Sequence, residues 1–361
     1  MNVKILMKKI LIVNTPAKNK DFFGGPKRFT IDFEKYIKTS NYNVIIPRNS
    51  ANNYSKATQL FILIKTILKQ NPDLIILTTY GFHIIPTIFF GKILRRAKII
   101  SIIHSLKNVY PFQKERFNLS LRYIRNSILR NYLEKLMINH SDYKIIPSKL
   151  FLDKAITEGY SLNKSRVIHH FVNDDIILIN NNQKARKNIL IIVGSFLRIK
   201  GAEKLSIILN ALPNEYQLKW IGYNKNDKSQ EDLAKNWLSK EGSNFQILEQ
   251  VDFEKVIEFI DNSAILLVPS LFETFGMVAL ESCARAIPVI VSKNCGVSEI
   301  IHNSSAGEVI SFESPKELSE SINKILSNYL LYSSKALQLA KEYSWAYGIK
   351  QYLQLINQAI L

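Results

Sequence analysis

The sequence predicts a protein of two α/β domains, each a doubly wound, Rossmann-like and mainly parallel sheet, facing each other across a cleft. Short apolar runs alternate with amphipathic stretches along the whole chain, which is typical of repeated strand–helix units. The length of 361 residues is enough for two separate hydrophobic cores. A polar, asparagine-rich stretch from Val172 to Asn188 separates two such series and is typical of a linker or a surface loop.

The first series predicts a domain over residues 1–175. Its expected strands are Ile10–Asn14, Tyr42–Ile46, Leu74–Leu77, Lys98–Ile103 and Tyr143–Pro147. Its amphipathic segments include Thr30–Thr39, Lys56–Gln70 and Leu119–His140. The run from Leu74 to Gly91 carries no formal charge over nearly the length of a membrane span. Because Thr78, His83 and Pro86 interrupt it, the run favours a strand, a loop and a buried helix over a span.

The second series predicts a domain over residues 186–345. Its expected strands are Asn188–Gly194, Gln217–Ile221, Phe245–Leu248, Ala264–Pro269 and Pro288–Ser292. Its expected helices begin near Gly201, cover Asp232–Glu241, Phe253–Asn262 and Met277–Arg285, and continue in a helical tail from Pro315. Ligands of doubly wound folds bind at the carboxyl ends of the strands, where loops and helix N-termini converge.

Composition excludes several classes of protein. A hydrophobic fraction of 47% and a charged fraction of 22% are ordinary for a globular chain and argue against a disordered or fibrous one. The two cysteines, Cys283 and Cys295, are too few for a disulfide framework and indicate a reducing compartment. No metal-ligand spacing of His, Cys, Asp or Glu occurs, and we find no targeting segment. We therefore expect no metal site.

The positive charge is confined to the first half. Residues 1–180 hold 29 Lys and Arg against 11 Asp and Glu, whereas residues 181–361 hold 19 of each, so the whole net charge of +18 lies in residues 1–180. The basic residues Arg122, Arg125, Arg130 and Lys135 alternate with aliphatic and aromatic residues in the expected helix Leu119–His140. A second basic cluster contains Lys92, Arg95, Arg96 and Lys98. This pattern favours contact with an anionic membrane surface, with a solvated basic face as the alternative.

The stretch from Val268 to Glu281 carries the strongest chemical signal. An apolar strand ends at Pro269, a turn contains Gly276, and a helix begins directly after it. Free backbone N–H groups at such a helix start would point at an anion such as a diphosphate. Glu273 and Glu281 suit neutral hydroxyl partners, such as a ribose and a hexose at the two ends of that diphosphate. Taken alone, two glutamates at this spacing have little specificity and favour an ordinary strand–helix unit with surface glutamates.

The surrounding residues make the signal specific. The chain has Pro269-Ser270, then Glu273-Thr-Phe275-Gly276, Glu281 and Pro288-Val289-Ile290, followed by Gly296-Val-Ser-Glu299-Ile300 and Ala306-Gly307. Upstream lie Val193-Gly194-Ser195, Arg198-Ile-Lys200-Gly201, His140-Ser-Asp142 and Gly24-Gly25, and downstream lies Ser344-Trp345. Together these motifs resemble the retaining glycosyltransferases of the GT-B type, family 4 (glycosyl transferases group 1). The resemblance spans nearly the whole chain and is most specific from residue 193 to 307.

The resemblance implies a set of site residues. The catalytic residues would be His104, Glu273 and Lys200. The donor-binding residues would be Gly24, Gly25, Arg198, Lys200, Glu273, Phe275, Gly276, Met277, Val278 and Glu281. Such folds neutralise phosphate with lysine, arginine and helix N-termini in place of Mg²⁺, so no metal and no cofactor are expected. A final helix, about 346–361, would pack back on the first domain.

Three departures from the family pattern affect donor contacts. Ser195 replaces the usual arginine, so Arg198 is the remaining candidate for a second phosphate-binding cation. The usual Asn-Gly-Val-Asp appears within the stretch His169 to Asp174, and Ile287 replaces the glycine before Pro288.

The expected protein is therefore a metal-independent, retaining hexosyltransferase that uses a UDP- or GDP-sugar. Its acceptor would be a glycan or a polyprenyl-diphosphate-linked sugar in bacterial surface polysaccharide assembly (O-antigen, capsule or lipopolysaccharide). It would work in the cytoplasm, peripherally on the inner face of the membrane, and would bind no nucleic acid. The alternatives are a basic nucleic-acid-binding protein, suggested by a pI near 9.6, and a non-catalytic scaffold of the same fold. A dinucleotide-dependent oxidoreductase is disfavoured because no G-x-G-x-x-G follows Ile10–Asn14.

Overall fold

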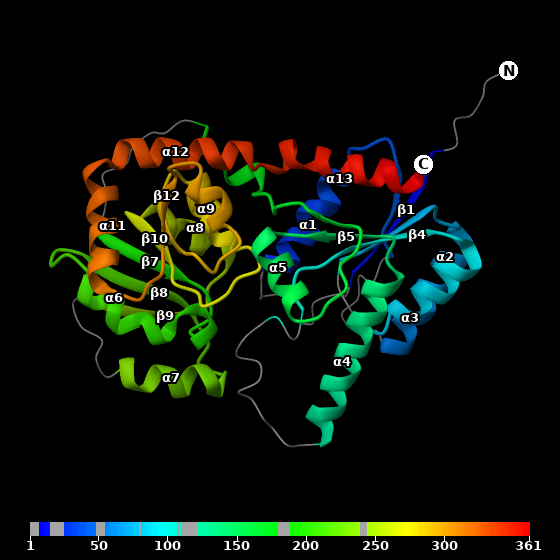
Figure 1. Ribbon diagram of the computed structural model, residues 1–361, viewed down its shortest axis with the longest axis horizontal. Coiled ribbons are helices and arrows are strands. Elements are labelled where there is room, and N and C mark those ends of the chain that lie inside the picture. The colour runs from blue at the N-terminus through cyan, green and yellow to red at the C-terminus, as the bar shows by residue number, and fades with distance from the viewer. Residues whose placement is uncertain are drawn as a thin grey trace. The chain divides into compact units, whose positions relative to one another are not determined.

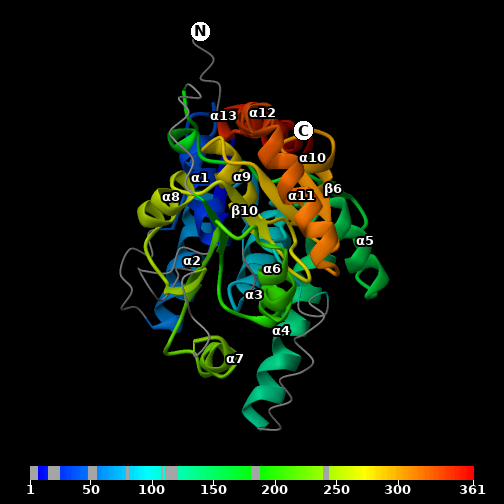
Figure 2. The same ribbon diagram turned by 90° about the vertical axis from the view of Figure 1, so that its left-hand side faces the viewer.

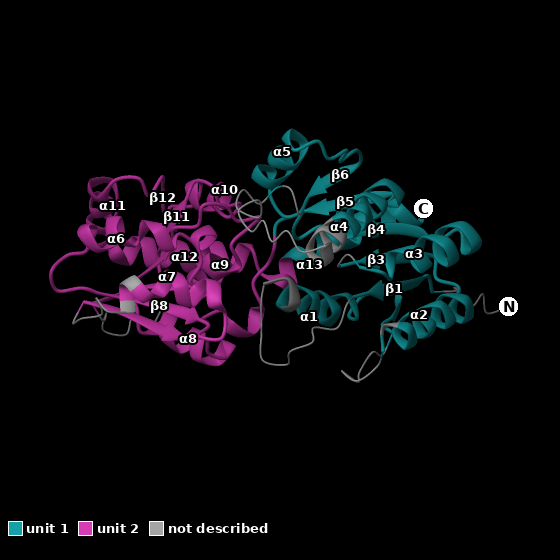
Figure 3. Ribbon diagram, turned by 90° about the horizontal axis from the view of Figure 1, so that it is seen from below, with its two compact units in different colours: residues 1–20, 26–169, 348–361 teal, residues 21–25, 170–347 magenta. Residues whose placement is uncertain are grey.

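The computed structural model describes residues 7–14, 25–47, 55–78, 81–106, 109, 121–179, 188–238 and 244–361. The chain forms two compact units, coloured separately in Figure 3. The first unit comprises residues 1–20, 26–169 and 348–361, and the second comprises residues 21–25 and 170–347.

The first unit is built on a six-stranded sheet with the order β2-β1-β3-β4-β5-β6, in which every pairing is parallel. Its strands are β1 (Lys9–Val13), β2 (Asn43–Ile45), β3 (Leu74–Leu77), β4 (Lys98–Ile102), β5 (Tyr143–Ile146) and β6 (Ser165–Val167). Its helices are α1 (Gly25–Ile37), α2 (Lys56–Gln70), α3 (Ile84–Pro86), the π-helical η1 (Thr87–Leu94), α4 (Leu121–His140), α5 (Lys149–Thr157) and most of α13 (Trp345–Ile360). The five expected strands are confirmed to within two residues, whereas β6 and α5 were not expected.

Helices on both faces of this sheet explain why its central strands are continuous apolar runs. All four residues of β3 are buried. On one side, Phe29 and Phe33 of α1 pack against Tyr352 of α13, with ring centroids 6.1 and 5.2 Å apart. The C-terminal helix is therefore part of the core of the first unit.

The segment after β3 differs from the expected buried helix. Ile84, Thr87 and Ile88 are buried, but Phe89 is 54% exposed and Ile93 is 64% exposed. The prediction was therefore right for one side of the segment and wrong for the other, because an uninterrupted apolar run carries no polar residues that would mark an exposed side. No helix among the described residues is long and apolar enough to cross a membrane.

The second unit contains another six-stranded parallel sheet, with the order β12-β11-β10-β7-β8-β9. Its strands are β7 (Ile189–Val193), β8 (Gln217–Tyr223), β9 (Phe245–Glu249), β10 (Ile265–Val268), β11 (Val289–Ser292) and β12 (Gly307–Ile310). Its helices are the short η4 (Asp174–Ile176), η5 (Arg198–Lys200) and η6 (Ala202–Lys204), with α6 (Leu205–Ala211), α7 (Lys228–Leu238), α8 (Phe253–Asp261), α9 (Met277–Ala284), α10 (Ser298–His302), α11 (Pro315–Ser327) and α12 (Tyr329–Glu342). Strand β12 and helix α10 were not expected as separate elements.

Alternate residues of each strand in this sheet enter two different cores. Leu190 and Ile192 of β7 pack in a cluster with side chains of α6 and α11. Ile191, between them, packs in a second cluster with side chains of α8, α9 and α12. Figures 1 and 2 show these two groups of helices on opposite faces of the sheet. Successive residues of a strand point to opposite faces, so both must be apolar when both faces are covered.

The chain enters and leaves the second unit side by side. The amide of Val172 donates to the carbonyl of Tyr343 at 2.9 Å, and the amide of Trp345 donates to the carbonyl of Val172 at 3.1 Å. The guanidinium of Arg285, at the end of α9, forms a two-pronged ion pair with Asp261 at 2.7 and 2.8 Å. It also donates to the carbonyl of Ile176 at 2.9 Å, which fixes the entering segment to the unit.

Candidate functional site

Three loops at the carboxyl ends of neighbouring strands form the candidate site of the second unit. They comprise residues 194–201 after β7, residues 269–276 after β10, and residues 293–297 after β11. The three strands are adjacent in the sheet, in the order β11-β10-β7. Their loops therefore emerge at the same edge, where doubly wound sheets bind ligands.

A close approach between Gly201 and Pro269 locks the first two loops together. Gly201 has a φ of +90°, and a β-carbon at this position would lie 2.4 Å from the carbonyl oxygen of Pro269. The amide of Leu271 donates to the carbonyl of Ile199 at 2.9 Å next to this contact. Only glycine fits both the space and the backbone conformation.

This contact places Lys200, the residue before Gly201, beside Glu273. The Nζ of Lys200 forms an ion pair with the Oε1 of Glu273, and the side chains are 34% and 15% exposed. The hydroxyl of Ser270 donates to the same oxygen at 3.1 Å. The lysine and the carboxylate therefore balance each other's charge, and both remain partly open to solvent.

The third loop supports the backbone of the Glu273–Gly276 turn. The amide of Glu273 donates to the carbonyl of Asn294 at 3.1 Å, and the amide of Gly296 donates to the carbonyl of Glu273 at 3.1 Å. The amide of Val297 donates to the carbonyl of Phe275 at 2.7 Å. The turn thus gains a short parallel pairing that holds Glu273 at a fixed position.

The Glu273–Gly276 turn leads directly into a helix. Gly276 adopts a φ of +106°, and a β-carbon there would lie 3.2 Å from Cγ1 of Val297. Helix α9 begins at the next residue, Met277, as the sequence indicates. Its first two residues, Met277 and Val278, are half-buried, and Glu281 lies one turn further and is 2% exposed. The first N–H groups of α9 have no partner within the helix and are suited to an anion.

Phe275 is buried and also packs against His170. It is 1% exposed, and its ring meets the imidazole of His170 edge to face, with centroids 5.4 Å apart. The structure therefore brings Lys200, Glu273, Phe275, Gly276, Met277, Val278 and Glu281 together at one edge of the sheet. Their roles in donor binding stay predictions.

Arg198 has an ion pair of its own. Its Nε contacts Glu203 at 3.1 Å, and the two side chains are 47% and 35% exposed. Exposed pairs of this kind are weak, about 0–1 kcal/mol, so this one is readily exchanged for a stronger partner. Ser195, where the family has arginine, is half-buried in the same loop.

One residue that positions the site was not predicted. The side-chain oxygen of Gln230 accepts from the amide of Phe196 at 3.0 Å and from the amide of Asn224 at 3.1 Å. Gln230 is 4% exposed and belongs to α7, which begins earlier than the expected Asp232. It ties the loop after β7 to the loop after β8. A single glutamine outside the predicted helix gives no sequence signal for this role.

His104 lies in the first unit, directly after β4. It is 9% exposed, and its ring packs edge to face on Phe29 with centroids 4.6 Å apart. Burial lowers the pKa of His104 to about 4, so the imidazole is neutral at pH 7. A neutral imidazole suits a hydrogen-bonding contact to a sugar or acceptor, which stays a prediction. Gly25 is the first residue of α1, and Gly24 lies outside the described residues.

The basic residues of α4 are not equivalent. Arg130 is engaged by Glu134, with Nε 3.0 Å from Oε1, and the carboxylate is fully buried and also accepts from the hydroxyl of Tyr160 at 3.2 Å. Its role in membrane contact stays a prediction, although its guanidinium is already paired with a buried carboxylate. Lys135 is exposed. Arg122 and Arg125 belong to α4, but their side chains lie outside the described residues.

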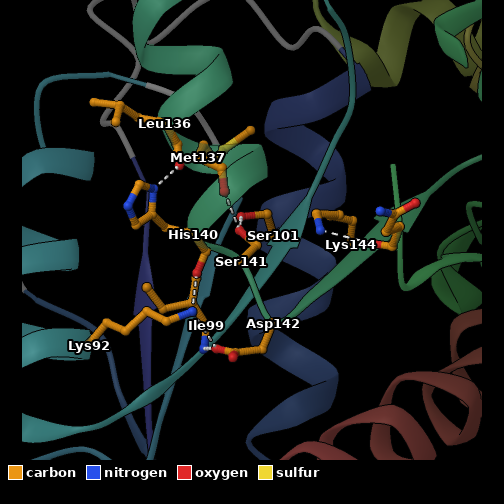
Figure 4. A network of polar contacts seen from close by, with 10 residues as sticks. Lys92, Ile99, Ser101, Leu136, Met137, His140, Ser141, Asp142 and Lys144 are labelled. Carbon is orange, nitrogen blue, oxygen red and sulfur yellow. Dashed lines mark hydrogen bonds and ion pairs between the residues drawn. The ribbon is translucent and has the colours of Figure 1, made fainter. Parts of the chain in front are cut away.

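Lys92 of the second basic cluster is also engaged. Figure 4 shows its Nζ pointing at Asp142, 3.2 Å away, and donating to the carbonyl of His140 at the end of α4. Asp142 in turn accepts from the amide of Ile99 at 2.8 Å. Lys92 thus fastens η1 to α4 and β4. Among the side chains that the structure describes, no group of three or more His, Cys, Asp or Glu is placed to hold a metal ion.

The fold and the site together define a class. Two doubly wound six-stranded parallel sheets, the second carrying Lys200, Glu273 and Glu281 at its carboxyl edge, are the architecture of the GT-B glycosyltransferases. Residues 174–343 match the family model described as glycosyl transferases group 1. Residues 174–343 of the chain therefore form a domain of that family of glycosyltransferases.

Individual relatives agree with this placement. The chain is 30% identical over 227 residues to an uncharacterized glycosyltransferase of Methanocaldococcus jannaschii, a match that covers 62% of this chain and 61% of that protein's length. It is 27% identical over 282 residues to an uncharacterized 41.2 kDa protein in the cps region of Klebsiella pneumoniae, covering 74% of both chains. The structure resembles Anabaena HepE, solved in complex with UDP and glucose, with a TM-score of 0.67 at 16% identity over 98% of this chain and 100% of that one.

Proposed function

We propose that the protein is a retaining glycosyltransferase that moves a hexose from a nucleotide-sugar donor to a glycan or lipid-linked acceptor. The observation that carries the proposal is the ion pair of Lys200 and Glu273 beside the turn that leads into α9, in two loops that are held together at Gly201 and Pro269. A cation, a carboxylate and free helix N–H groups at one sheet edge match the three parts of such a donor: its diphosphate and the sugars on either side of it.

Each residue has a distinct task in this proposal. The Lys200 ammonium and the first amides of α9 bind the diphosphate, and Glu273 binds hydroxyls of the transferred sugar. Glu281 binds the ribose. The similarity to a protein solved with UDP and glucose favours a UDP-sugar over a GDP-sugar.

In the reaction, the bond between the anomeric carbon and the diphosphate oxygen breaks, and a bond from that carbon to an acceptor hydroxyl oxygen forms. The acceptor proton leaves with the departing diphosphate or with solvent. Because no side chain of the site is an evident nucleophile, the main catalytic effect is stabilisation of the leaving diphosphate by Lys200 and the helix N-terminus. We propose that no metal ion takes part, so transfer should continue in EDTA.

The acceptor side of the proposal is assembly of a bacterial surface polysaccharide on a polyprenyl diphosphate, at the cytoplasmic face of the membrane. The relative in a cps region supports it. The confinement of the whole net charge of +18 to residues 1–180 also supports it, because such a half is attracted to anionic lipid.

A screen of UDP- and GDP-sugars for thermal stabilisation, followed by sugar release in the presence and absence of EDTA, tests the proposal. Glu281→Ala should weaken binding of the free nucleotide, and Glu273→Ala should reduce transfer while the nucleotide still binds. Each lost charged hydrogen bond costs about 1.5–3 kcal/mol. Glu313→Ala, which removes an exposed carboxylate paired with Lys204 at 2.8 Å, is the control. Unchanged turnover in both site variants, or a strict Mg²⁺ requirement, would contradict the proposal.

A further inference from the structure

A short segment of the first unit exposes an unusual number of large apolar side chains. Between residue 82 and the end of η1 these side chains are 43–64% exposed, and they are Phe82, Ile85, Phe89, Ile93 and Leu94. Three of them recur at a spacing of four residues, which places them along one side of a helical segment. Single exposed apolar residues are normal on a protein surface, but a stripe of them indicates an interaction site.

The exposure does not come from loose packing of the segment. Its opposite side is fixed to the sheet, because a β-carbon on Gly91 would lie 2.4 Å from Cδ1 of Ile75 in β3. Thr87 is fully buried and donates to the carbonyl of His83 at 2.8 Å. The far end is fastened by Lys92, which reaches Asp142 and the end of α4 (Figure 4). The apolar stripe is therefore presented by a rigid element.

Neighbouring helices also carry exposed apolar side chains. Helix α2 packs against α3 and η1, and α3 packs against α4. Figure 1 shows α2, α3 and α4 next to one another. On α2, Phe61 is 66% exposed, and on α4, Ile128 and Tyr132 are 67% and 56% exposed. Exposed apolar side chains thus occur on each of these adjoining elements.

The charge of the same elements has one sign. Within α2, α3, η1 and α4 the sequence has a single acidic residue, Glu134, and it is fully buried against Arg130. The exposed charged side chains that the structure describes in this region are basic; they are Lys65 and Lys69 on α2, Arg95, Arg96 and Lys98 after η1, and Lys135 on α4. An apolar stripe followed directly by basic residues is complementary to the acyl chains and the anionic headgroups of a bilayer.

The kind of apolar residue separates a bilayer from a nucleic acid. Single-stranded nucleic acid is bound by aromatic rings on which bases stack. Here the exposed set also contains the aliphatic Ile85, Ile93, Leu94 and Ile128, which offer no stacking face but readily enter a layer of acyl chains.

We propose that residues 82–98 form a membrane-insertion element, in which Phe89 and Ile93 enter an anionic bilayer while Arg96 and Lys98 contact its headgroups. This inference deepens the proposed function, and it rests on the lipid-linked acceptor of that function. It replaces the arginines of α4, of which Arg130 is already neutralised, as the main contact with lipid.

Co-sedimentation of the full chain with vesicles tests the element, using phosphatidylcholine alone and phosphatidylcholine with about one third phosphatidylglycerol. The wild type should bind the anionic vesicles. The double variant Phe89→Ser with Ile93→Ser should bind them at least tenfold more weakly at any salt concentration. The matched control is Leu330→Ser with Leu331→Ser on α12, where the side chains are 57% and 55% exposed, and it should bind as the wild type does. Arg96→Gln with Lys98→Gln should lose about tenfold in affinity at low salt and the preference for anionic lipid.

A site-specific probe reports insertion directly. Cys283 and Cys295, the two cysteines of the chain, are both fully buried, so a cysteine introduced at an exposed position can be labelled selectively. An environment-sensitive dye on Phe89→Cys should brighten and shift to the blue with anionic vesicles, and the same dye on Leu331→Cys should not. Wild-type binding by the Phe89–Ile93 double variant, an unchanged spectrum at position 89, or binding to a single-stranded oligonucleotide with none to vesicles would each overturn the proposal.

The membrane readouts are independent of the donor site. Thermal stabilisation by sugar nucleotides should be the same in the Phe89–Ile93 variant and the wild type, since the donor residues belong to the second unit. Vesicle insertion without any sugar-nucleotide binding would reject the proposed transfer and leave the insertion element standing, and the reverse result would reject the element alone.

Discussion

The ammonium of Lys200 and the carboxylate of Glu273, 73 residues apart in the chain, form an ion pair at the carboxyl edge of the second sheet. The pair exists because Gly201 lets the backbone of one loop touch the carbonyl of Pro269 in the other. If the proposed donor binds here, its diphosphate would compete with Glu273 for the lysine. Binding would then change the partner of Lys200 and free Glu273 for sugar hydroxyls.

The first prediction follows from this competition. Glu273→Gln removes the carboxylate but keeps the size of the side chain, so UDP alone should bind severalfold more tightly than to the wild type, while transfer falls by about tenfold or more. Lys200→Met should weaken UDP binding by about tenfold or more, because a charged hydrogen bond is lost. Isothermal titration with UDP and a transfer assay measure both. Weaker UDP binding by Glu273→Gln would show that the carboxylate does not compete for the lysine.

The second prediction concerns the contact that aligns the two loops. Gly201→Ala should destabilise the protein by about 1–3 kcal/mol and weaken donor binding, since a methyl group would collide with the carbonyl of Pro269 at a φ of +90°. Gly159→Ala is the matched control, because Gly159 has a φ of +83° but nothing within 4 Å of its β-carbon position. Urea unfolding and titration with a sugar nucleotide separate the two costs. Equal effects of the two variants would mean that backbone strain alone matters and the loop contact does not.

The third prediction tests Gln230. Gln230→Leu leaves the amides of Phe196 and Asn224 without their acceptor, at a cost of about 1–3 kcal/mol for each buried group. We therefore expect lower stability in urea and faster hydrogen exchange at these two amides. Gln246→Leu, on an exposed position of β9, is the control. If exchange at both amides stays slow in Gln230→Leu, the glutamine does not hold the two loops.

The sequence predicted most of the fold because buried parallel strands leave a clear signal. The run Leu74–Leu77 is apolar throughout, and its bounds were predicted correctly. The strand β6 has the sequence Ser-Arg-Val and lies at the edge of its sheet, so a short, partly polar edge strand gave no comparable run. The exposed side of η1 was not predicted, because apolar residues on both sides of a helix leave no polar positions that would mark the exposed one.

The candidate site was predictable only in part. Glu273, Gly276 and Glu281 are close in the sequence, and the turn and helix between them follow from residue types. The assignment of Lys200 and Glu273 to one site rested on the family resemblance. The two residues are 73 positions apart, and no local sequence pattern indicates that they meet. The support from Asn294, Gly296 and Val297 uses backbone groups, which any residue except proline supplies equally. The side chains at these positions therefore do not predict the backbone hydrogen bonds.

The last prediction uses the burial of His104. Burial lowers the pKa of His104 to about 4 in the folded protein, whereas an exposed histidine has a pKa near 6.5. Between these values the unfolded chain binds a proton that the folded chain does not, so stability falls as the pH falls. Over this window His104 alone should remove about 3 kcal/mol of stability. Above pH 7 both states are neutral at this residue, and the effect should vanish.

His104→Phe should keep a ring against Phe29 and remove this proton. Urea unfolding at a series of pH values should therefore show a shallower loss of stability for the variant between pH 6.5 and 4, with the two curves parallel above pH 7. The exposed His302, changed to Asn, controls for the loss of an imidazole that is not buried. If the curves of wild type and His104→Phe stay parallel throughout, His104 is protonated in the folded protein as readily as in the unfolded chain, and its assignment as a neutral sugar or acceptor contact would have to be given up.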